Sequence, residues 1–331
     1  MDTAIDSANS QGPAAIALSG KQRTCVVARL SGGLGNQMFQ YAAGRALALK
    51  TGSRLVLDAT AFTLPTERRT FALDGYRLVA EVSFAGYAHQ PVKGVIRFPR
   101  SRRYRWIDGA AELLRVAIGP VGREAREKTF SVLTEKSFDF DARFCRRGAQ
   151  TYLVGYWQSE RYFAGVADLI REELTYVRAP NATNAGWLAR ISTANAVCVH
   201  VRRGDYLLGP HFEHHGVCSA DYYRRAMRLM RERAPGPQFF VFSDDWRWCR
   251  EHLAGADTVI VDANAPGAVQ DELRLMAACR HHVIANSSLS WWAAWLSTGH
   301  RQVVVGPQPW FAMTTLTPDL FPRGWLVLPR D

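Results

Sequence analysis

Several signals that would settle a function class at once are missing from this sequence. It has no GxxxxGK[ST] loop, which disfavours a P-loop kinase, and no long Lys/Arg run of the kind that binds nucleic acid. Acidic residues are in deficit, since 41 Lys and Arg stand against 30 Asp and Glu. The net charge of +11 favours an anionic partner such as a phosphorylated small molecule, a nucleic acid or an acidic membrane, although a solvated basic face explains it equally well.

Cysteine pairs and targeting signals are also lacking. The six cysteines include no CxxC pair, and several lie in apolar runs such as Val197-Cys198-Val199, which indicates reduced core thiols. Residues 1–22 have no basic start, and their only apolar stretch is too short for a signal peptide or a membrane span. We therefore expect a flexible lead-in to a cytoplasmic protein, with possible peripheral contact of the basic region 97–147 with the inner face of a membrane.

The hydrophobic pattern predicts an α/β fold. A strand at 25–30, a glycine loop at 31–37, a helix at about 37–50 and a strand at 55–58 form one β-α-β unit. Residues 60–150 are irregular, and we expect them to be partly helical with long loops. A strand at 151–157 and a helix at 161–174 follow, and residues 178–184 are the best linker candidate.

The second half of the chain is more regular. Short apolar strands alternating with helices predict a parallel sheet covered on both faces. We therefore predict a lead-in at 1–22 and two Rossmann-like domains, 23–180 and 190–331, facing a cleft. The strands are expected at 196–201, 238–242, 258–261, 282–285 and 302–305, and the helices at about 220–233, 245–253, 269–279 and 288–297.

Polar clusters directly follow three of these strands. Ligands of open parallel sheets bind outside the carboxyl ends of the strands, so the three clusters are expected to meet at one site. They are His200, Arg202, Arg203 and Asp205 after the first strand, Ser243, Asp244 and Asp245 after the second, and Asn286, Ser287 and Ser288 after the fourth.

These residue types suit a phosphorylated ligand. Arg202 and Arg203 offer guanidinium forks for phosphate oxygens, and alternation along an extended chain predicts that one reaches the ligand while the other pairs with a carboxylate such as Asp205. Ser287 or Ser288 would cap a helix whose first amides form a phosphate site. The alternative is that Ser288 only caps the helix and Arg203–Asp205 is only a salt bridge.

The two aspartates after the second strand allow more than one function. Asp244 and Asp245 could accept hydrogen bonds from a guanine edge or hold a divalent metal. Asp245 could instead be only the N-cap of the following helix.

Three rival motifs are weaker. Gly33-Leu34-Gly35 with Asp58 imitates a dinucleotide fingerprint, but Met38 occupies the third glycine position. Residues 139–141 resemble a metal-binding DxD but are expected to form a loop, since no strong strand precedes them. Residues 211–215 are histidine-rich without zinc spacing, and we expect a mobile polar loop there.

Three segments together resemble the α-1,2-fucosyltransferase family. They are Gly32-Gly33-Leu34-Gly35-Asn36-Gln37-Met38-Phe39-Gln40-Tyr41, His200-Val201-Arg202-Arg203-Gly204-Asp205-Tyr206 and Asn286-Ser287-Ser288-Leu289-Ser290-Trp291-Trp292. Phe242-Ser243-Asp244-Asp245 also matches family members. The HxRRxD pattern within the second segment is shared with α-1,6- and protein O-fucosyltransferases.

The resemblance implies a GT-B fold, a GDP-fucose donor, no required metal or cofactor, and inversion at the anomeric carbon. By motif position Arg202 would contact the β-phosphate. His200 and Asp245 would lie on the guanine side, Asn286, Ser287 and Ser288 would line the pyrophosphate, and the glycine loop of Gly33, Gly35 and Asn36 would face the cleft from the acceptor domain.

The expected reaction transfers L-fucose to the 2-hydroxyl of a galactose-containing glycan in surface polysaccharide synthesis. Arg202 would stabilise the leaving GDP, and Asp205 is nominated as the base on chemical type. Acceptor contacts are expected from Tyr156, Trp157 and Gln158. Two alternatives remain. One is a transferase for another GDP-sugar, and the other is a non-catalytic protein that binds nucleotides or nucleic acid.

Overall fold

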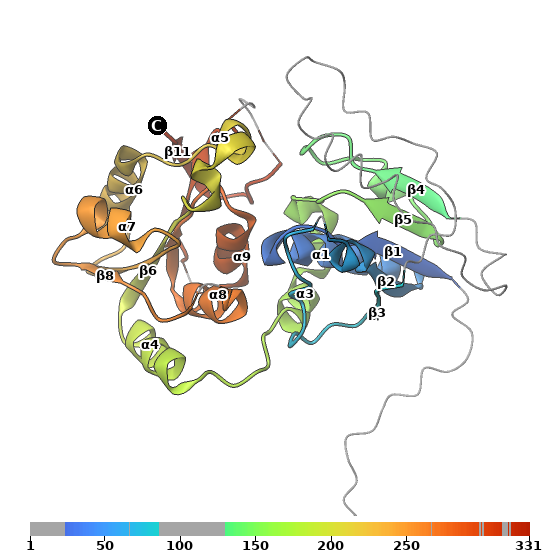
Figure 1. The fold of residues 1–331 in the computed structure, drawn as a ribbon, viewed down its shortest axis with the longest axis horizontal. Helices are drawn as coiled ribbons and strands as arrows, with labels where there is room; N and C mark the ends of the chain where they lie inside the picture. The colour runs from blue at the N-terminus through green and yellow to red at the C-terminus, as the bar shows by residue number, and fades with distance from the viewer. Residues whose placement is uncertain are drawn as a thin grey trace, which may run out of the picture.

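The computed structural model describes residues 24–85 and 130–331, apart from residues 66, 266, 298, 300, 313–316 and 318. Two parallel β-sheets form the centres of two α/β units, with helices packed on them (Figure 1). The predicted α/β class is therefore confirmed. The N-terminal lead-in and most of the basic region 97–147 lie outside the described residues.

The first unit is built on a five-stranded sheet with the order β3-β2-β1-β5-β4. Side chains of its central strand alternate, with Val26 and Ala28 in one core and Cys25 and Val27 in another on the opposite face. Its elements are β1 (Cys25–Arg29), α1 (Leu34–Thr51), β2 (Arg54–Asp58), β3 (Glu81–Ser83), β4 (Ser131–Thr134), β5 (Thr151–Val154) and α3 (Ala167–Glu173). Short 3₁₀ helices occupy Thr60–Thr63, Phe144–Arg146, Glu160–Tyr162 and Ala164–Val166.

The second unit has a six-stranded sheet with the order β11-β10-β9-β6-β7-β8. Its strands are β6 (Asn195–Val201), β7 (Pro237–Ser243), β8 (Thr258–Ile260), β9 (His281–Val283), β10 (Val304–Gln308) and β11 (Leu326–Pro329). Its α-helices are α4 (Ala182–Ser192), α5 (Gly209–His215), α6 (Ala220–Arg233), α7 (Trp246–Leu253), α8 (Val269–Ala278) and α9 (Ser288–Leu296), with a 3₁₀ turn at Asp205–Leu207.

The order of the strands places a switch point in each sheet. In the second sheet the chain starts at β6, adds β7 and β8 on one side, and then adds β9, β10 and β11 on the other, which is the order of a dinucleotide-binding sheet. The order therefore reverses between β6 and β9. In the first sheet the corresponding reversal lies between β1 and β5. Ligands of such sheets bind at these points, outside the carboxyl ends of the strands.

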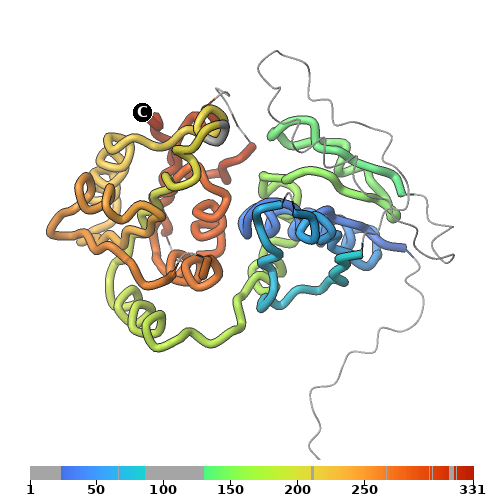
Figure 2. The backbone as a smooth tube through the Cα atoms, viewed as in Figure 1, coloured from blue at the N-terminus to red at the C-terminus, as the bar shows by residue number. Residues whose placement is uncertain are grey.

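One hydrophobic core joins the two units. Phe39 of α1 lies 4.5 Å from Trp291 and 4.9 Å from Trp292 of α9, measured between ring centroids, and Phe163 stacks on Trp292 at 5.6 Å. The Trp292 indole also donates to the Gly35 carbonyl across the junction at 2.9 Å. The chain passes between the units along the segment from α3 to α4 (Figure 2).

Several element predictions need correction. Residues 182–184 of the expected linker begin α4, because the Asn181 side chain accepts the Asn184 amide and caps the helix. The expected helix at 161–174 is broken into 3₁₀ turns before α3, and α5 occupies residues where a polar loop was predicted. A short strand, β4, does precede residues 139–141. It lies at the edge of the sheet with Ser131 and Val132 exposed, so it lacks the apolar pattern by which a strand is predicted.

Two predictions concern burial and membranes. Five of the six cysteines are buried, as expected for core thiols, Cys145 is exposed, and none forms a disulfide. Within the described ranges, none of the helices has both the length and the apolar character needed to cross a bilayer.

Candidate active site

The structure brings the three polar clusters together at the switch point of the second sheet. Val201 at the end of β6 lies opposite Ser243 at the end of β7, so Arg202 and Asp244 emerge side by side. The Tyr206 hydroxyl donates to the Asn286 carbonyl at 3.4 Å, which links the β6 cluster to the one that follows β9. The three strand ends therefore form one polar surface, as their sequence positions predicted.

Arg202 lies between two carboxylates. Its guanidinium contacts Asp205 at 2.5 Å and Asp244 at 2.9 Å, and its side chain remains 24% exposed. Arg203 instead pairs with Asp245 at 3.2 Å, and its guanidinium lies 4.4 Å above the Trp248 ring. The predicted Arg203–Asp205 pair is therefore wrong, because the alternation of side chains after β6 turns Arg203 toward α7.

Asp205 has a second cationic partner, from the other unit. Its remaining carboxylate oxygen contacts Arg69 at 2.6 Å. Both oxygens of Asp205 are thus engaged by guanidinium groups. An acceptor hydroxyl would have to displace one of them, so this geometry argues against Asp205 as the base and favours a role in orienting Arg202.

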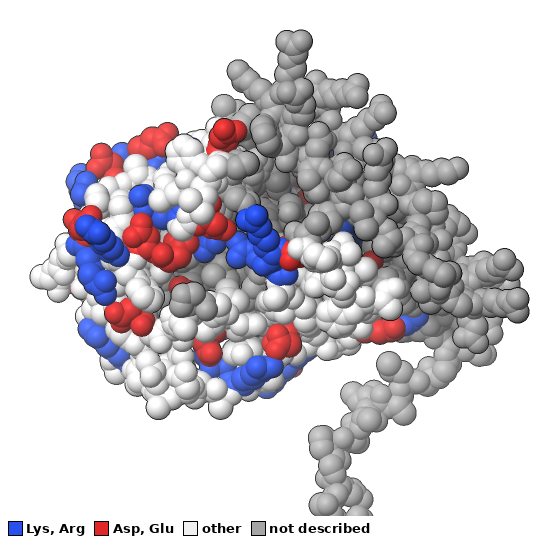
Figure 3. Space-filling view, viewed as in Figure 1, with Lys and Arg blue, Asp and Glu red and all other residues white. Residues whose placement is uncertain are grey.

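Asp245 is the N-cap of α7. Its Oδ1 accepts the Trp248 amide at 3.1 Å, and its own amide donates to Ser243 Oγ at 2.9 Å. The capping alternative is therefore the arrangement present, with the second oxygen held by Arg203. Asp244 accepts the Arg203 amide at 2.9 Å, so both aspartates also fix the loop after β6. Figure 3 shows the interleaving of basic and acidic side chains over this unit.

His200 is a buried, uncharged imidazole. It is 3% exposed, and burial, assisted by the neighbouring Arg202 charge, lowers its pKa to about 3. Among the described residues its Nδ1 has no hydrogen-bond partner. A buried unpaired ring nitrogen is unfavourable, so His200 is suited to exchange a hydrogen bond with a bound polar group.

The cluster after β9 divides into structural and ligand-facing parts. The Asn286 amide group donates to the carbonyls of His215, Gly216 and Trp310 at 2.9, 3.2 and 3.1 Å, so it braces the end of α5. The side-chain amide is thus engaged within the protein, and the assignment of Asn286 to the pyrophosphate stays a prediction. Ser287 is the N-cap of α9 but makes no side-chain capping bond, which leaves the first amides of α9 to a ligand.

The glycine loop of the first unit packs against this helix end. A Cβ on Gly35 would lie 2.5 Å from the Ser288 carbonyl carbon and 2.7 Å from the Leu289 amide nitrogen, so only glycine permits the contact. The N-cap of α1 is Gly33, which has no side chain that could bond to the first amides of that helix. The positive ends of α1 and α9 therefore converge and favour an anion between them. Figure 1 shows the two helices next to each other.

The loop after β5 lies at the other switch point. The Gln158 amide donates to Asn36 Oδ1 at 2.8 Å and is thereby tied to the glycine loop. Trp157 is fully buried, so it cannot stack on an acceptor sugar, contrary to expectation. The backbone amides of Tyr156 and Trp157 donate to Glu135 at 2.7 and 3.0 Å. Burial raises the pKa of Glu135 to about 7 despite these bonds.

Sequence reasoning missed two charged residues of the site. Arg69 lies in an irregular segment without a motif. Glu272 stands in the first turn of α8, where a helical pattern makes an acidic residue look like an ordinary surface group. Burial raises the pKa of Glu272 to about 7, with a further contribution from Asp244 and an opposing one from Arg202. A carboxyl with this pKa exchanges a proton near neutral pH.

The rival motifs find structural explanations. Asp58 accepts from the Tyr152 hydroxyl at 2.6 Å and from Thr60, and Met38 is fully buried, so neither suits a dinucleotide. Asp141 of the DxD segment pairs with Arg143 in a loop, as predicted. The described part of the chain contains no group of three or more His, Cys, Asp or Glu side chains placed to hold a metal.

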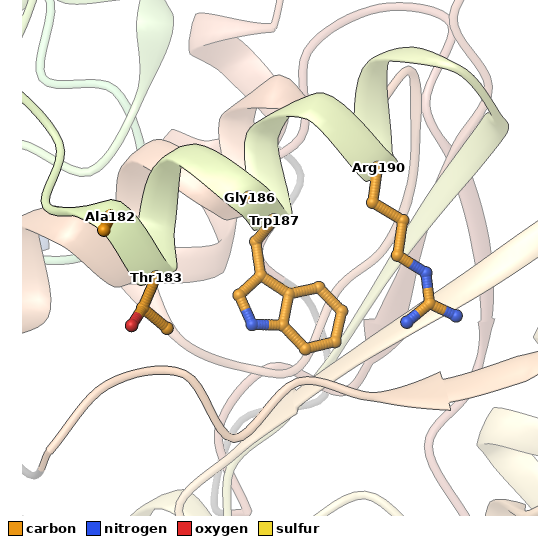
Figure 4. Close-up of a pocket in the computed structure, with 5 residues that line it drawn as sticks. All are labelled: Ala182, Thr183, Gly186, Trp187 and Arg190. Carbon is orange, nitrogen blue, oxygen red and sulfur yellow. The ribbon is translucent and has the colours of Figure 1, made fainter.

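A surface depression lies away from these strand ends. It has a volume of about 260 Å³ and is lined by residues along one side of α4 (Figure 4). Trp187 and Arg190 extend from one side of the helix, with the guanidinium 5.3 Å from the indole centroid. None of the predicted site residues lines it.

Comparison with known proteins decides the class. Residues 124–328 match the glycosyl transferase family 11 profile. The chain belongs to glycosyl transferase family 11. Its relatives include the α-1,2-colitosyltransferase of Escherichia coli, 31% identical over 91% of this chain and 98% of that protein. The O-antigen biosynthesis glycosyltransferase WbnK of Escherichia coli is 30% identical over 86% and 94%, respectively. Galactoside α-(1,2)-fucosyltransferase 1 of Bos taurus is 31% identical over 44% of each chain.

Membership makes this chain a glycosyltransferase, as predicted. The family 11 profile takes in all three strand-end clusters and the Tyr156–Gln158 segment, whereas the glycine loop lies before it. The relationship to the colitosyltransferase runs over 317 residues and covers nearly the whole length of both proteins.

Proposed function

We propose that this family 11 protein transfers L-fucose from GDP-fucose to the 2-hydroxyl of a galactose-containing glycan, with inversion, in the synthesis of a surface polysaccharide. The observation that carries the proposal is the position of Arg202 at the switch point of a dinucleotide-type sheet. Its guanidinium lies 5.4 Å from the ring centroid of Tyr206, whose hydroxyl donates to the Asn286 carbonyl shortly before α9. The names of the relatives support the linkage, the galactoside acceptor and the O-antigen context.

The chemistry follows from charge. Attack of the acceptor oxygen on the anomeric carbon breaks the bond to the β-phosphate oxygen and leaves a more negative GDP. The Arg202 guanidinium and the first amides of α9 would stabilise that charge, and no metal is needed in this scheme. His200 would meet the guanine side from its buried position, while Asp205 and Asp244 hold the Arg202 guanidinium in place.

A second donor has a specific observation in its favour. The colitosyltransferase matches the chain nearly end to end, whereas the galactoside fucosyltransferase matches over less than half of it. A GDP-linked dideoxy sugar such as colitose is therefore the alternative donor. It would use the same diphosphate contacts, since the two proposals differ only around the sugar ring.

A donor and acceptor panel tests the proposal. Purified protein would be given GDP-fucose, GDP-colitose or GDP-mannose with a galactoside in the presence of EDTA, and GDP release and the product linkage would be measured. We expect transfer from GDP-fucose, an α-1,2 linkage by NMR, and no product with the matched 2-deoxygalactoside. Transfer from GDP-colitose alone would replace fucose as donor. Absence of transfer together with nucleic-acid binding would contradict an enzymatic role.

A further inference from the structure

Arg69 crosses from the first unit to a carboxylate of the second. It lies between the 3₁₀ helix Thr60–Thr63 and β3, and its guanidinium contacts Asp205 at 2.6 Å. The two side chains are 49% and 30% exposed. An ion pair this exposed contributes little to folding, so stability alone does not account for the contact.

The segment that carries Arg69 is held from both units. Buried Gln37, in the glycine-loop motif, donates to the Thr70 carbonyl at 2.9 Å and accepts the Ala72 amide at 2.9 Å. From the second unit, Gln270 of α8 donates to the Ala72 carbonyl at 3.1 Å. The backbone next to Arg69 is thus fixed relative to the switch point, although the side chain itself is half exposed.

Arg69 balances the charge of the strand-end cluster. The ion pairs after β6 and β7 join three cations and three anions: Arg69, Arg202 and Arg203 with Asp205, Asp244 and Asp245. Only Arg69 in this set comes from the first unit. Without it, two guanidinium groups would face three carboxylates, and Arg202 would be the only cationic partner of both Asp205 and Asp244 in this set. An incoming diphosphate would then meet a net negative cluster.

We propose that Arg69 is a positioning residue of the transfer reaction, which neutralises Asp205 from across the unit junction and so leaves Arg202 available to the donor diphosphate. This inference rests on the proposed GDP-sugar donor. It also adds a charged side chain of the first unit to donor binding, beside the positive end of α1. Arg69 acts through Asp205 and need not touch the substrate.

Donor binding and steady-state kinetics test the inference. We expect Arg69→Gln to weaken GDP-fucose binding about tenfold at low salt, because a carboxylate next to Arg202 loses its partner. The donor KM should rise more than kcat falls, and the effect should shrink at high salt. Arg69→Lys should retain most of the affinity. Adding Asp205→Asn to Arg69→Gln should restore binding, since both charges are then removed.

Two matched variants separate this role from general effects. Arg68→Gln removes the same charge from the neighbouring exposed residue. Arg161→Gln breaks another ion pair between the units, with Asp319 at 2.5 Å. Both should bind GDP-fucose as the wild type does. Equal weakening in either control, unchanged binding in Arg69→Gln, or no recovery in the double variant would overturn the inference. If the wild type itself binds no GDP-fucose, the proposed function fails with it.

Discussion

Glu272 places a titrating carboxyl beside the arginine assigned to the donor diphosphate. Burial raises its pKa to about 7, so the carboxyl is largely neutral below pH 7 and negative above it. His200, on the same side of β6, does not titrate in this range because its pKa is lowered to about 3. Glu272, in the first turn of α8, therefore changes its charge near physiological pH, whereas His200 does not.

We expect GDP-fucose affinity to fall several-fold as the pH rises from 6 to 8. A negative Glu272 opposes a diphosphate held by Arg202, and the sugar diphosphate itself does not titrate there. In Glu272→Gln the affinity should be nearly independent of pH and close to the acidic value of the wild type. Isothermal titration at several pH values measures this, and the same pH dependence in the variant would assign it to another group.

For single residues, the sequence predicts which side chains lie at the site better than it predicts which of them form ion pairs. Because ligands of parallel sheets bind outside the carboxyl ends of the strands, Arg202, Asp244 and Ser287 were predicted to share one surface, and the structure agrees. The sequence did not predict which carboxylate meets which guanidinium. Asp205 pairs with Arg69, 136 positions away in the chain, and nothing in local spacing encodes that contact.

The contact between α1 and α9 is decided by one glycine. A Cβ at Gly35 would lie 2.5 Å from the backbone of Ser288, whereas a Cβ at Gly33 would meet nothing within 4 Å. Backbone atoms cannot yield as a flexible side chain can, so the helices would have to separate. Their separation would also disrupt the Trp292 bond to the Gly35 carbonyl.

Gly35→Ala should therefore lower the free energy of unfolding by about 1–3 kcal/mol and reduce donor affinity, since the helix ends that favour the anion move apart. Gly33→Ala is the matched control and should change stability by less than about 1 kcal/mol. Urea unfolding and GDP-fucose binding measure both effects. Equal stability of the two variants would show that the helix contact is not as close as described.

Elements with a strongly buried face were predicted well. Most of the strand and helix alternation after residue 195 was predicted to within a few residues, as in α6 at Ala220–Arg233, whereas α5 and β11 were not predicted. Helix α4 was missed because only Asn184 and Ile191 are buried in it, which leaves almost no apolar periodicity. The helix begins where the Asn181 side chain accepts the Asn184 amide, and Asn181 lies in a polar segment whose composition is typical of a linker.

The whole molecule is held together by a core that the two units share. Phe39 and Phe163 of the first unit pack with Trp291 and Trp292 of the second, and all four are almost completely buried. The domain boundaries predicted from composition stay a prediction. The shared core was not predicted, because it is formed by helices far apart in the sequence and the hydrophobic pattern of each helix does not show which other helix it contacts.

We expect the two sheets to unfold in one transition. Native-state hydrogen exchange should give the same opening free energy for β1 and β6 amides, since separation of the units exposes the core cluster that both share. Trp292→Phe, which loses the bond to Gly35, should lower both values together by about 1–2 kcal/mol. A lower opening energy at β1 alone would mean that the units are energetically independent.

The central claim is that Arg202 stabilises the leaving GDP without a metal. It is tested most directly by GDP release from GDP-fucose, with acceptor and EDTA present, in the wild type and in Arg202→Ala. The account predicts chelator-resistant release by the wild type and a loss of about a hundredfold or more in a variant that remains folded by circular dichroism. Unchanged release in Arg202→Ala, or release that EDTA abolishes in the wild type, would contradict it.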